Sequence, residues 1–367
     1  MIKIQYPVDP VKLKEFNTSY FKKIITVLGA QPILETTLKK VKLADGSRLS
    51  LRKLLTADFL ELMNLDTAIK TLSKADVLNL APLTTYKIVQ PAIAEFFMNQ
   101  DFLKMSSCYY CNIDSIYIYN EFGDYRTPLA FIQQAHVEQL ILIKGIGKIA
   151  AEKIKAKREK KQFLSVKDCP VSDNVKKRLE DFKFHTKLTH NHFTLDHFYH
   201  QAEHDLLSLC LYNFVPCCYV CNSKLKKAGK LYLLDASKSS PSSSGFSFHN
   251  DVRFKVYFKT DGNDVNNLDD FSVNLEITNN DKEHADFLRQ LKIRGRYMHY
   301  KHEALRLIRQ QVEYPITMLD EIARTFGKTS DALKRDIFGK EIYDADYDNS
   351  SLVKYKRDVA KSIGILK

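Results

Sequence analysis

Glycine and proline are scarce in this chain, with 12 and 10 among 367 residues. So few residues of these types exclude a linker-rich chain and argue against an all-β protein, which needs many turns. Hydrophobic residues make up 44% of the chain and charged residues 27%, a balance that excludes wholesale disorder. A chain of this length forms about two to three domains and buries a core of its own.

Long apolar runs are missing as well. No stretch reaches the roughly 20 apolar residues that span a bilayer, and the opening sequence MIKIQYPVDPVKLK contains no apolar region of the signal-peptide kind. We therefore expect a cytoplasmic protein without a membrane span. Lys and Arg (56) exceed Asp and Glu (44) by 12. This excess favours polyanionic partners, although on charge alone a membrane surface stays possible.

The seven cysteines are distributed unevenly. Cys108 and Cys111 form one C-x-x-C pair, and Cys218 and Cys221 form a second pair about a hundred residues later. Two such pairs in a cytosolic chain indicate a metal site rather than disulfides, and four thiolates suit tetrahedral zinc. Cys217 is a competing ligand, although only Cys218 has the two-residue spacing to Cys221. Buried free thiols without a metal are the alternative.

A helical segment in the middle of the chain contains two glycines, Gly145 and Gly147, separated by one apolar residue. This spacing predicts a sharp turn between helices and leaves free N–H groups at the start of the second helix, a geometry that binds anions. Between Lys144 and Lys161 there are eight basic residues and two acidic ones. The residues that carry a resemblance to the helix-hairpin-helix family are Gly145, Gly147, Ala150, Ala151, Phe163 and Ser165.

That resemblance implies contact with nucleic-acid phosphates without regard to sequence, through the amides of the hairpin and the lysines beside it. The expected contact residues are Lys144, Gly145, Gly147, Lys148 and Lys153. The alternative is a packing or protein-docking unit whose lysines form a solvated face.

The most informative string runs from residue 193 to residue 227. It predicts a short strand that ends in Asp196-His197, a loop, a second apolar strand from Leu211 to Val215, and a helix that begins near Cys221-Asn222. A unit of this size is too small to be stable by burial alone, and a structural metal would stabilise it.

Together these residues resemble the HNH, or ββα-metal, endonuclease family, in which zinc stabilises the fold and a separate divalent ion takes part in catalysis. The resemblance implies that His197 is the general base and that Asp196 is a ligand of a catalytic Mg²⁺ or Mn²⁺ ion. Asn213 would orient the base and Asn222 would complete the metal site, which makes the chain an H-N-N variant. An imidazole whose ordinary pKa is about 6.5 accepts a proton from water at neutral pH.

Other polar side chains lie near this string. Lys224 and Lys226 are close enough in sequence to contact phosphates, or they are simply surface lysines. A histidine-rich metal site is a further possibility, formed by His190, His192, His200 and His204.

Within the HNH family, the resemblance extends to bacterial proteins with a C-x-Y-C motif, an L-D-H-F core and a basic C-terminal pattern. The nuclease subunits of Septu-type anti-phage systems belong to this group, and they work with an ATPase partner. The matching C-terminal positions are Arg296–Leu305, Phe338–Gly339 and Lys354–Val359. The first of these segments either packs within the protein or binds substrate or a partner.

These features predict a mainly α fold with a small zinc-stapled ββα-metal (HNH) core, a helix-hairpin-helix insert, and a β-hairpin plus helices at the C-terminus. Within the last region, we expect Ala236–Gly245 to be an exposed connection and Val252–Lys259 with Phe271–Thr278 to form the hairpin. The expected domains are a helical N-terminal region (1–104), a first zinc half-site (105–131), the insert (132–185), the HNH core with the second half-site (186–235), and the C-terminal region (236–367).

The predicted function is that of a metal-dependent HNH endonuclease that hydrolyses phosphodiester bonds of DNA in bacterial anti-phage defence. RNA, including tRNA, is an alternative substrate for the same site, because attack of water on a phosphate needs no deoxyribose. A second alternative is a zinc-containing protein that binds nucleic acid or a partner without turnover.

Overall fold

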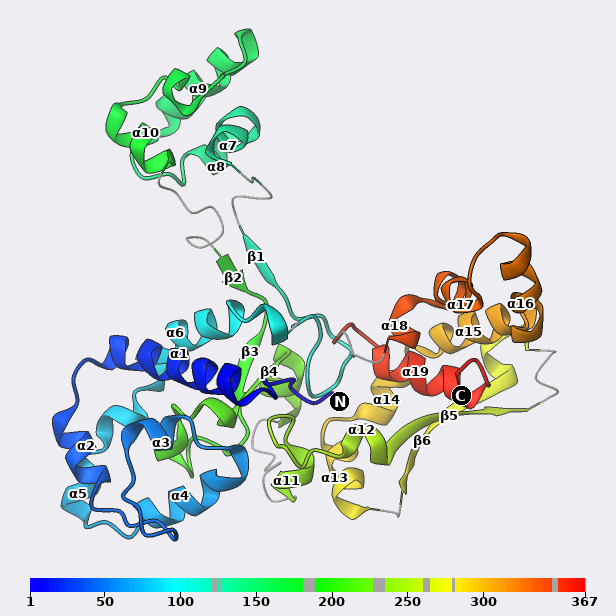
Figure 1. The fold of residues 1–367 in the computed structure, drawn as a ribbon, viewed down its shortest axis with the longest axis horizontal. Helices are drawn as coiled ribbons and strands as arrows, with labels where there is room; N and C mark the ends of the chain where they lie inside the picture. Colours follow the sequence, from blue (N-terminus) through cyan, green and yellow to red (C-terminus); the bar gives the residue numbers. More distant parts are fainter. Residues whose placement is uncertain are drawn as a thin grey trace. The chain divides into compact units, whose positions relative to one another are not determined.

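The computed structural model describes residues 1–103, 105–120, 125, 127–180, 189–226, 235–259, 265–278, 281–344 and 349–366. The chain divides into two compact units: the first combines Met1–Tyr117 with Phe193–Lys367, and the second is Ile118–His192. The described residues are mainly helical, with short two-stranded antiparallel sheets (Figure 1), which confirms the predicted mainly α fold. The second unit lies in sequence between the two cysteine pairs and includes the stretch 132–185, for which an insert is predicted.

The first hundred residues of the first unit form a group of helices. Asp9 caps the first of them by accepting a hydrogen bond from the N–H of Lys12 at 2.9 Å, and Gly29 ends it with a positive φ of 72°. This helix packs on α6 through the rings of Phe16 and Phe96, whose centroids are 5.1 Å apart. The helices are α1 (Pro10–Leu28), α2 (Pro32–Leu38), α3 (Leu51–Leu55), α4 (Leu62–Ile69), α5 (Lys74–Leu78) and α6 (Tyr86–Met98).

Residues 194–226 form a strand, a loop, a second strand and a helix in that order. The strand β3 (Thr194–His197) pairs antiparallel with β4 (Phe214–Cys217), so that His197 lies opposite Phe214. The predicted start of the second strand at Leu211 is wrong: residues 211–213 form a 3₁₀ turn, in which the N–H of Asn213 donates to the carbonyl of Cys210 at 3.1 Å, and pairing with β3 begins at Phe214. A π-helix, Val220–Lys226, follows β4.

The second unit contains one of the small sheets and a group of helices around its own apolar core. The strand β1 (Ile118–Asn120) pairs antiparallel with β2 (Thr189–Asn191). The core includes Phe131, Leu140 and Ile154. The helices are α7 (Pro128–Gln134), α8 (Val137–Leu140), α9 (Lys148–Lys160) and α10 (Asp173–Glu180).

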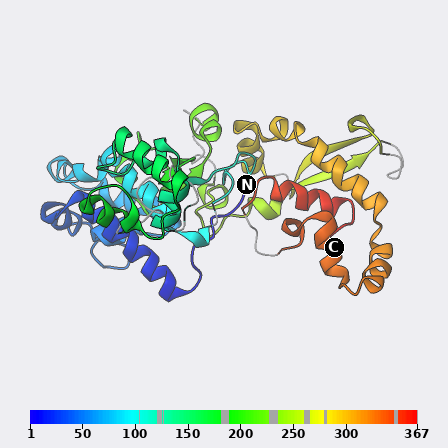
Figure 2. The same cartoon turned by 90° about the horizontal axis from the view of Figure 1, so that it is seen from above.

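The C-terminal part of the first unit is built on the predicted hairpin, which is confirmed as β5 (Val252–Phe258) paired with β6 (Phe271–Ile277). Both Figure 1 and Figure 2 show α19 alongside this hairpin, where Asp358 accepts from the N–H of Phe254 at 3.1 Å. The helices are α11 (Ala236–Ser239), α12 (Phe248–Asp251), α13 (Lys282–Gln290), α14 (Ile293–Met298), α15 (Lys301–Glu313), α16 (Ile316–Thr325), α17 (Ser330–Phe338), α18 (Lys340–Tyr343) and α19 (Val353–Ser362).

The Ser-rich stretch Ala236–Gly245 is not the exposed connection that its composition predicts. Ser240 and Ser243 are fully buried, and the hydroxyl of Ser242 donates to the carbonyl of Phe214 in β4 at 3.0 Å. The N–H of Ile4 donates to the carbonyl of Pro241 at 2.9 Å. Residues 239–243 are buried because small hydroxyl side chains fit between neighbouring segments, where several of them form hydrogen bonds.

Candidate metal centre and catalytic cavity

Four cysteine sulfurs come together in the first unit. The Sγ atoms of Cys108, Cys111, Cys218 and Cys221 all lie within 4.8 Å of one another, and all four residues are buried. Burial and the neighbouring thiols raise the pKa of Cys108 well above its ordinary value, so a thiolate at this position requires a cation. Four soft ligands in a compact group suit tetrahedral zinc. The predicted grouping of the two cysteine pairs is therefore confirmed, and the site could hold zinc.

The turns of the two C-x-x-C pairs direct backbone N–H groups toward sulfur. The N–H of Ile113 donates to Cys111 Sγ, and the N–H of Cys221 donates to Cys218 Sγ, both at 3.4 Å. Asn112 adopts a left-handed φ of 54°, a conformation that asparagine tolerates better than most residues and that lets the chain turn back. These bonds stabilise negative charge on the sulfurs.

Two charged side chains outside the predicted ligand set contact the sulfurs. Arg296 donates from Nη1 to Cys221 Sγ at 3.2 Å and from Nη2 to Asp114 Oδ2 at 2.7 Å. The guanidinium therefore offsets part of the negative charge of the thiolates, as outer-shell groups at metal sites do. Asp114 Oδ2 also lies 2.9 Å from Cys218 Sγ. The number of residues between Arg296 and the cysteines follows no metal-site motif, so the sequence does not identify Arg296 as part of this site.

The remaining cysteines that lie near this site in sequence are not ligands. Cys217 Sγ lies 3.5 Å from Thr194 Oγ1 and is not one of the four clustered sulfurs, so the choice of Cys218 over Cys217 is confirmed. Cys210 donates to the carbonyl of Leu54 at 3.2 Å. These thiols are buried within the core of the first unit.

A cavity of about 390 Å³ lies at the end of β3. Its lining includes Asp196, His197 and Asn222, which are three of the four predicted catalytic residues. His200 and Lys226 line it as well. The pairing of β3 with β4, and the π-helix that follows β4, bring these side chains together.

The imidazole of His197 is fixed by its surroundings. Its Nε2 lies 2.9 Å from the carbonyl oxygen of Ser208, which can only accept, so Nε2 donates and Nδ1 of the neutral ring is left as the acceptor. The described residues give Nδ1 no hydrogen-bond partner. Tyr86 packs edge-on against the ring with centroids 4.4 Å apart. Burial lowers the pKa of His197 below 6.5, although the Ser208 carbonyl and the Asp196 carboxylate act in the opposite direction.

Asn213 is fully buried and does not line the cavity. Its Oδ1 accepts from the N–H of Tyr199 at 2.8 Å, and its Nδ2 donates to the carbonyls of Tyr199 and Leu207, both at 3.2 Å. These bonds tie together the loop between β3 and β4, which contains Ser208. Asn213 therefore acts on His197 through the loop and not by direct contact.

Lys226 and Lys224 have different surroundings, although the sequence predicts the same roles for both. Lys224 is exposed. Lys226 is 2% exposed, and its Nζ lies 2.5 Å from Asp196 Oδ2, so its interpretation as a surface lysine is wrong. The hydroxyl of Tyr110 donates to the same carboxylate oxygen at 2.5 Å. The ammonium of Lys226 is thus directed into the protein, toward Asp196.

The N-terminal helices, for which the sequence indicates no chemical role, support the loop after β3. Phe59 stacks on Tyr199 with ring centroids 5.1 Å apart. Nδ1 of His204 lies 2.8 Å from Oδ2 of Asp66 in α4. Since this loop supplies the carbonyl of Ser208, the N-terminal helices help to position the imidazole.

The alternative of a histidine-rich metal site gains no support. In the described part of the chain, one group of His, Cys, Asp or Glu side chains lies close enough together to bind a shared ion, and it consists of the four cysteines. His204 is paired with Asp66, whereas His190 and His192 belong to the second unit.

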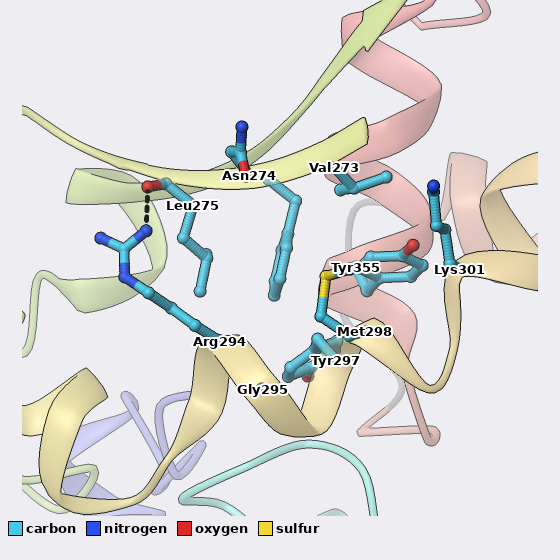
Figure 3. A pocket seen from close by; sticks show the side chains of 10 residues that line it. Val273, Asn274, Leu275, Arg294, Gly295, Tyr297, Met298, Lys301 and Tyr355 are labelled. Carbon is cyan, nitrogen blue, oxygen red and sulfur yellow. Dashed lines mark hydrogen bonds between the residues drawn. The ribbon is translucent and has the colours of Figure 1, made fainter. Parts of the chain in front are cut away.

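A second cavity, of about 300 Å³, lies in the C-terminal part of the first unit between β6, α14 and α19 (Figure 3). Arg294 at its edge donates to the carbonyl of Leu275 at 2.8 Å. The described residues that line it include apolar groups, two tyrosines and two cations, without a carboxylate or a histidine. This cavity therefore lacks the acid and base groups of the cavity at β3.

The predicted anion-binding hairpin lies in the second unit, between α8 and α9. Gly145 has a positive φ of 101°, and a Cβ there would lie 2.8 Å from Val175, so only glycine fits. Gly147 is the N-cap of α9, and Lys144, Lys148 and Lys153 are exposed. The hairpin therefore presents the first N–H groups of a 13-residue helix beside exposed lysines.

Comparisons with family models, curated proteins and solved structures found no match to this chain. In its described part, no helix is both long and apolar enough to cross a membrane.

Replacing Cys108 or Cys221 by Ser should remove zinc and unfold the first unit, because a structural zinc contributes folding free energy on the order of 10 kcal/mol. Zinc content by mass spectrometry and thermal unfolding measure both effects. Cys169→Ser, a change of a buried cysteine in the second unit, is the matched control and should keep the zinc. An unchanged zinc content in Cys108→Ser would contradict the assignment.

Proposed function

We propose that this chain is a zinc-containing endonuclease of the HNH type that hydrolyses phosphodiester bonds of DNA. The observation that carries the proposal is the position of His197. None of the described residues hydrogen-bonds to its Nδ1, its ring is held by Ser208, and it shares one cavity with Asp196 and Asn222. A fixed neutral imidazole in a polar cavity is the arrangement that general-base catalysis requires.

In this proposal, the cavity binds the scissile phosphate and a water molecule beside it. His197 takes a proton from that water at Nδ1 as the water oxygen bonds to phosphorus. The bond from phosphorus to the leaving sugar oxygen breaks, and that oxygen takes a proton from solvent water in the cavity. The Ser208 carbonyl and the Asp196 carboxylate stabilise the positive charge that develops on the ring. Asn213 keeps the loop, and therefore the ring, in the reactive orientation. A positioned base of this kind contributes about 10²- to 10⁴-fold to the rate.

The resemblance to HNH nucleases also implies a catalytic Mg²⁺ or Mn²⁺ ion at Asp196 and Asn222. The described residues do not fit such an ion in this arrangement. Oδ2 of Asp196 already accepts from Tyr110 and from the ammonium of Lys226, so a cation of the protein itself already offsets much of its negative charge. A divalent ion binds oxygen ligands that offset its own charge, and the remaining side chain, the amide of Asn222, is neutral. The proposed reaction therefore does not use that ion.

The second unit would hold DNA through its backbone. The start of α9 at Gly147 offers N–H groups to a phosphate, and the exposed Lys144, Lys148 and Lys153 supply positive charge. Contacts of this kind bind without regard to base sequence. They suit a long polyanionic substrate, and we propose that this substrate is DNA.

The biological setting is proposed from the resemblance alone. We propose that the nuclease acts in bacterial anti-phage defence with an ATPase partner protein. An ATPase gene beside the gene for this chain, and recovery of the two proteins as one complex, would support this setting.

His197→Ala should lower the rate of plasmid cleavage by about 10²- to 10⁴-fold, because the base is lost. His302→Ala is the control: it removes an exposed imidazole of the first unit that does not line this cavity and should leave cleavage near the wild-type rate. Zinc content should be unchanged in both variants. Cleavage by His197→Ala at the wild-type rate, with contaminating nucleases excluded, would contradict the assignment.

The rate of cleavage should rise with pH through a midpoint below 6.5, because burial lowers the pKa of His197 and only the neutral ring accepts a proton. Below that midpoint the ring is protonated and activity is lost. The charged groups that act on the ring are Asp196, Lys226 and His200. A profile of kcat/KM against pH at constant zinc content measures the midpoint, and a value above 7 would contradict this role.

Lys148→Ala and Lys153→Ala should each weaken DNA binding and flatten the slope of log affinity against log salt by about one unit, because each removes one phosphate contact. Fluorescence anisotropy over a series of salt concentrations measures the slope. Lys328→Ala, which removes an exposed lysine of the first unit, is the control and should leave the slope unchanged. Equal slopes for all three variants and the wild type would contradict the proposed interface.

A further inference from the structure

The ammonium of Lys226 occupies an unusual position for a lysine. It is buried at the wall of the cavity, where Nζ donates to Asp196 Oδ2 and to the carbonyl of His197, both at 2.5 Å, and to the carbonyl of Phe198 at 3.4 Å. An ammonium has three hydrogens, so these acceptors use all of its donors. A buried charge is stable only when it is paired and hydrogen-bonded in this way.

These acceptors are of the type that also binds a hard metal ion. A carboxylate oxygen and two backbone carbonyl oxygens surround the ammonium, at the wall of the cavity that Asn222 also lines. Oxygen ligands of this kind bind Mg²⁺, Mn²⁺ or Ca²⁺ in proteins. At this point of the structure, however, the cation is a side chain of the protein itself.

We propose that Lys226 is the resident cation of this cavity, and that its ammonium excludes a divalent ion from Asp196. The reason is electrostatic, because a second positive charge within a few ångströms of the buried ammonium is repelled more strongly there than in bulk water. The predicted exclusion of a divalent ion does not depend on catalysis. The part that concerns the reaction rests on the proposed function: Lys226 is then a positioning residue, which holds Asp196 and the backbone beside His197 in place.

The test is Mn²⁺ binding to the zinc-loaded protein without nucleic acid, measured by electron paramagnetic resonance. Lys226→Met keeps an unbranched side chain, one heavy atom shorter, and removes the charge, so it should bind Mn²⁺ about tenfold or more tightly than the wild type. The double variant Lys226→Met with Asp196→Asn should lose this gain, because the carboxylate is gone. Lys226→Arg keeps the charge and should bind Mn²⁺ as weakly as the wild type.

Lys224→Met is the matched control, since it removes an exposed lysine from the same π-helix and should leave Mn²⁺ affinity unchanged. Zinc content and thermal unfolding show whether each variant is folded, and Lys226→Gln replaces Lys226→Met if the latter is not. Two results together would overturn the proposal. The wild type would bind Mn²⁺ at a site that Asp196→Asn abolishes, and removal of the Lys226 charge would leave the Mn²⁺ affinity unchanged. Because binding is measured without substrate, this outcome is separate from a failure of the chain to cleave DNA.

Discussion

The four clustered sulfurs bring together parts of the chain that are far apart in sequence. One cysteine pair precedes the second unit, and the other directly follows β4, where the π-helix begins. Sulfur atoms this close are stable as thiolates only with a cation among them, so zinc would fix β4 and the π-helix against the first pair. Arg296 brings α14 to the same point, because its guanidinium bonds to the sulfur of Cys221. The cluster therefore connects the central strands to the C-terminal helices.

The cysteine cluster is also connected to the cavity at β3. Tyr110 lies between two of the cysteines in sequence, and its hydroxyl donates to Asp196. On the other side, Lys226 ends the π-helix that begins beside Cys221, and its ammonium donates to the same carboxylate oxygen. The position of Asp196 is thus set by two residues that the cysteine cluster holds in place. Loss of zinc would be expected to disturb the cavity as well as the fold.

Sequence reasoning succeeded where the chemistry is local. The C-x-x-C spacing places two sulfurs on one turn, and the predicted short strand that ends in Asp196-His197 is present as β3. It failed where a distant segment decides the outcome. Ser240 and Ser243 have the composition of an exposed linker, yet they are buried between other segments of the unit. Residues 211–213 are apolar enough for a strand, but hydrogen bonds of Asn213 to the loop bend them into a turn.

The sequence by itself determined the four cysteines that could hold a metal, the imidazole at the end of β3, and the glycine turn of the second unit. Each of these depends on residues close together in the chain, where spacing fixes geometry. Only the tertiary structure decided what surrounds them: Arg296 at the sulfurs, Ser208 at the imidazole, and the ammonium of Lys226 at Asp196. These contacts join residues whose spacing in sequence has no fixed relation to distance, and burial then sets the charge that each site can bear.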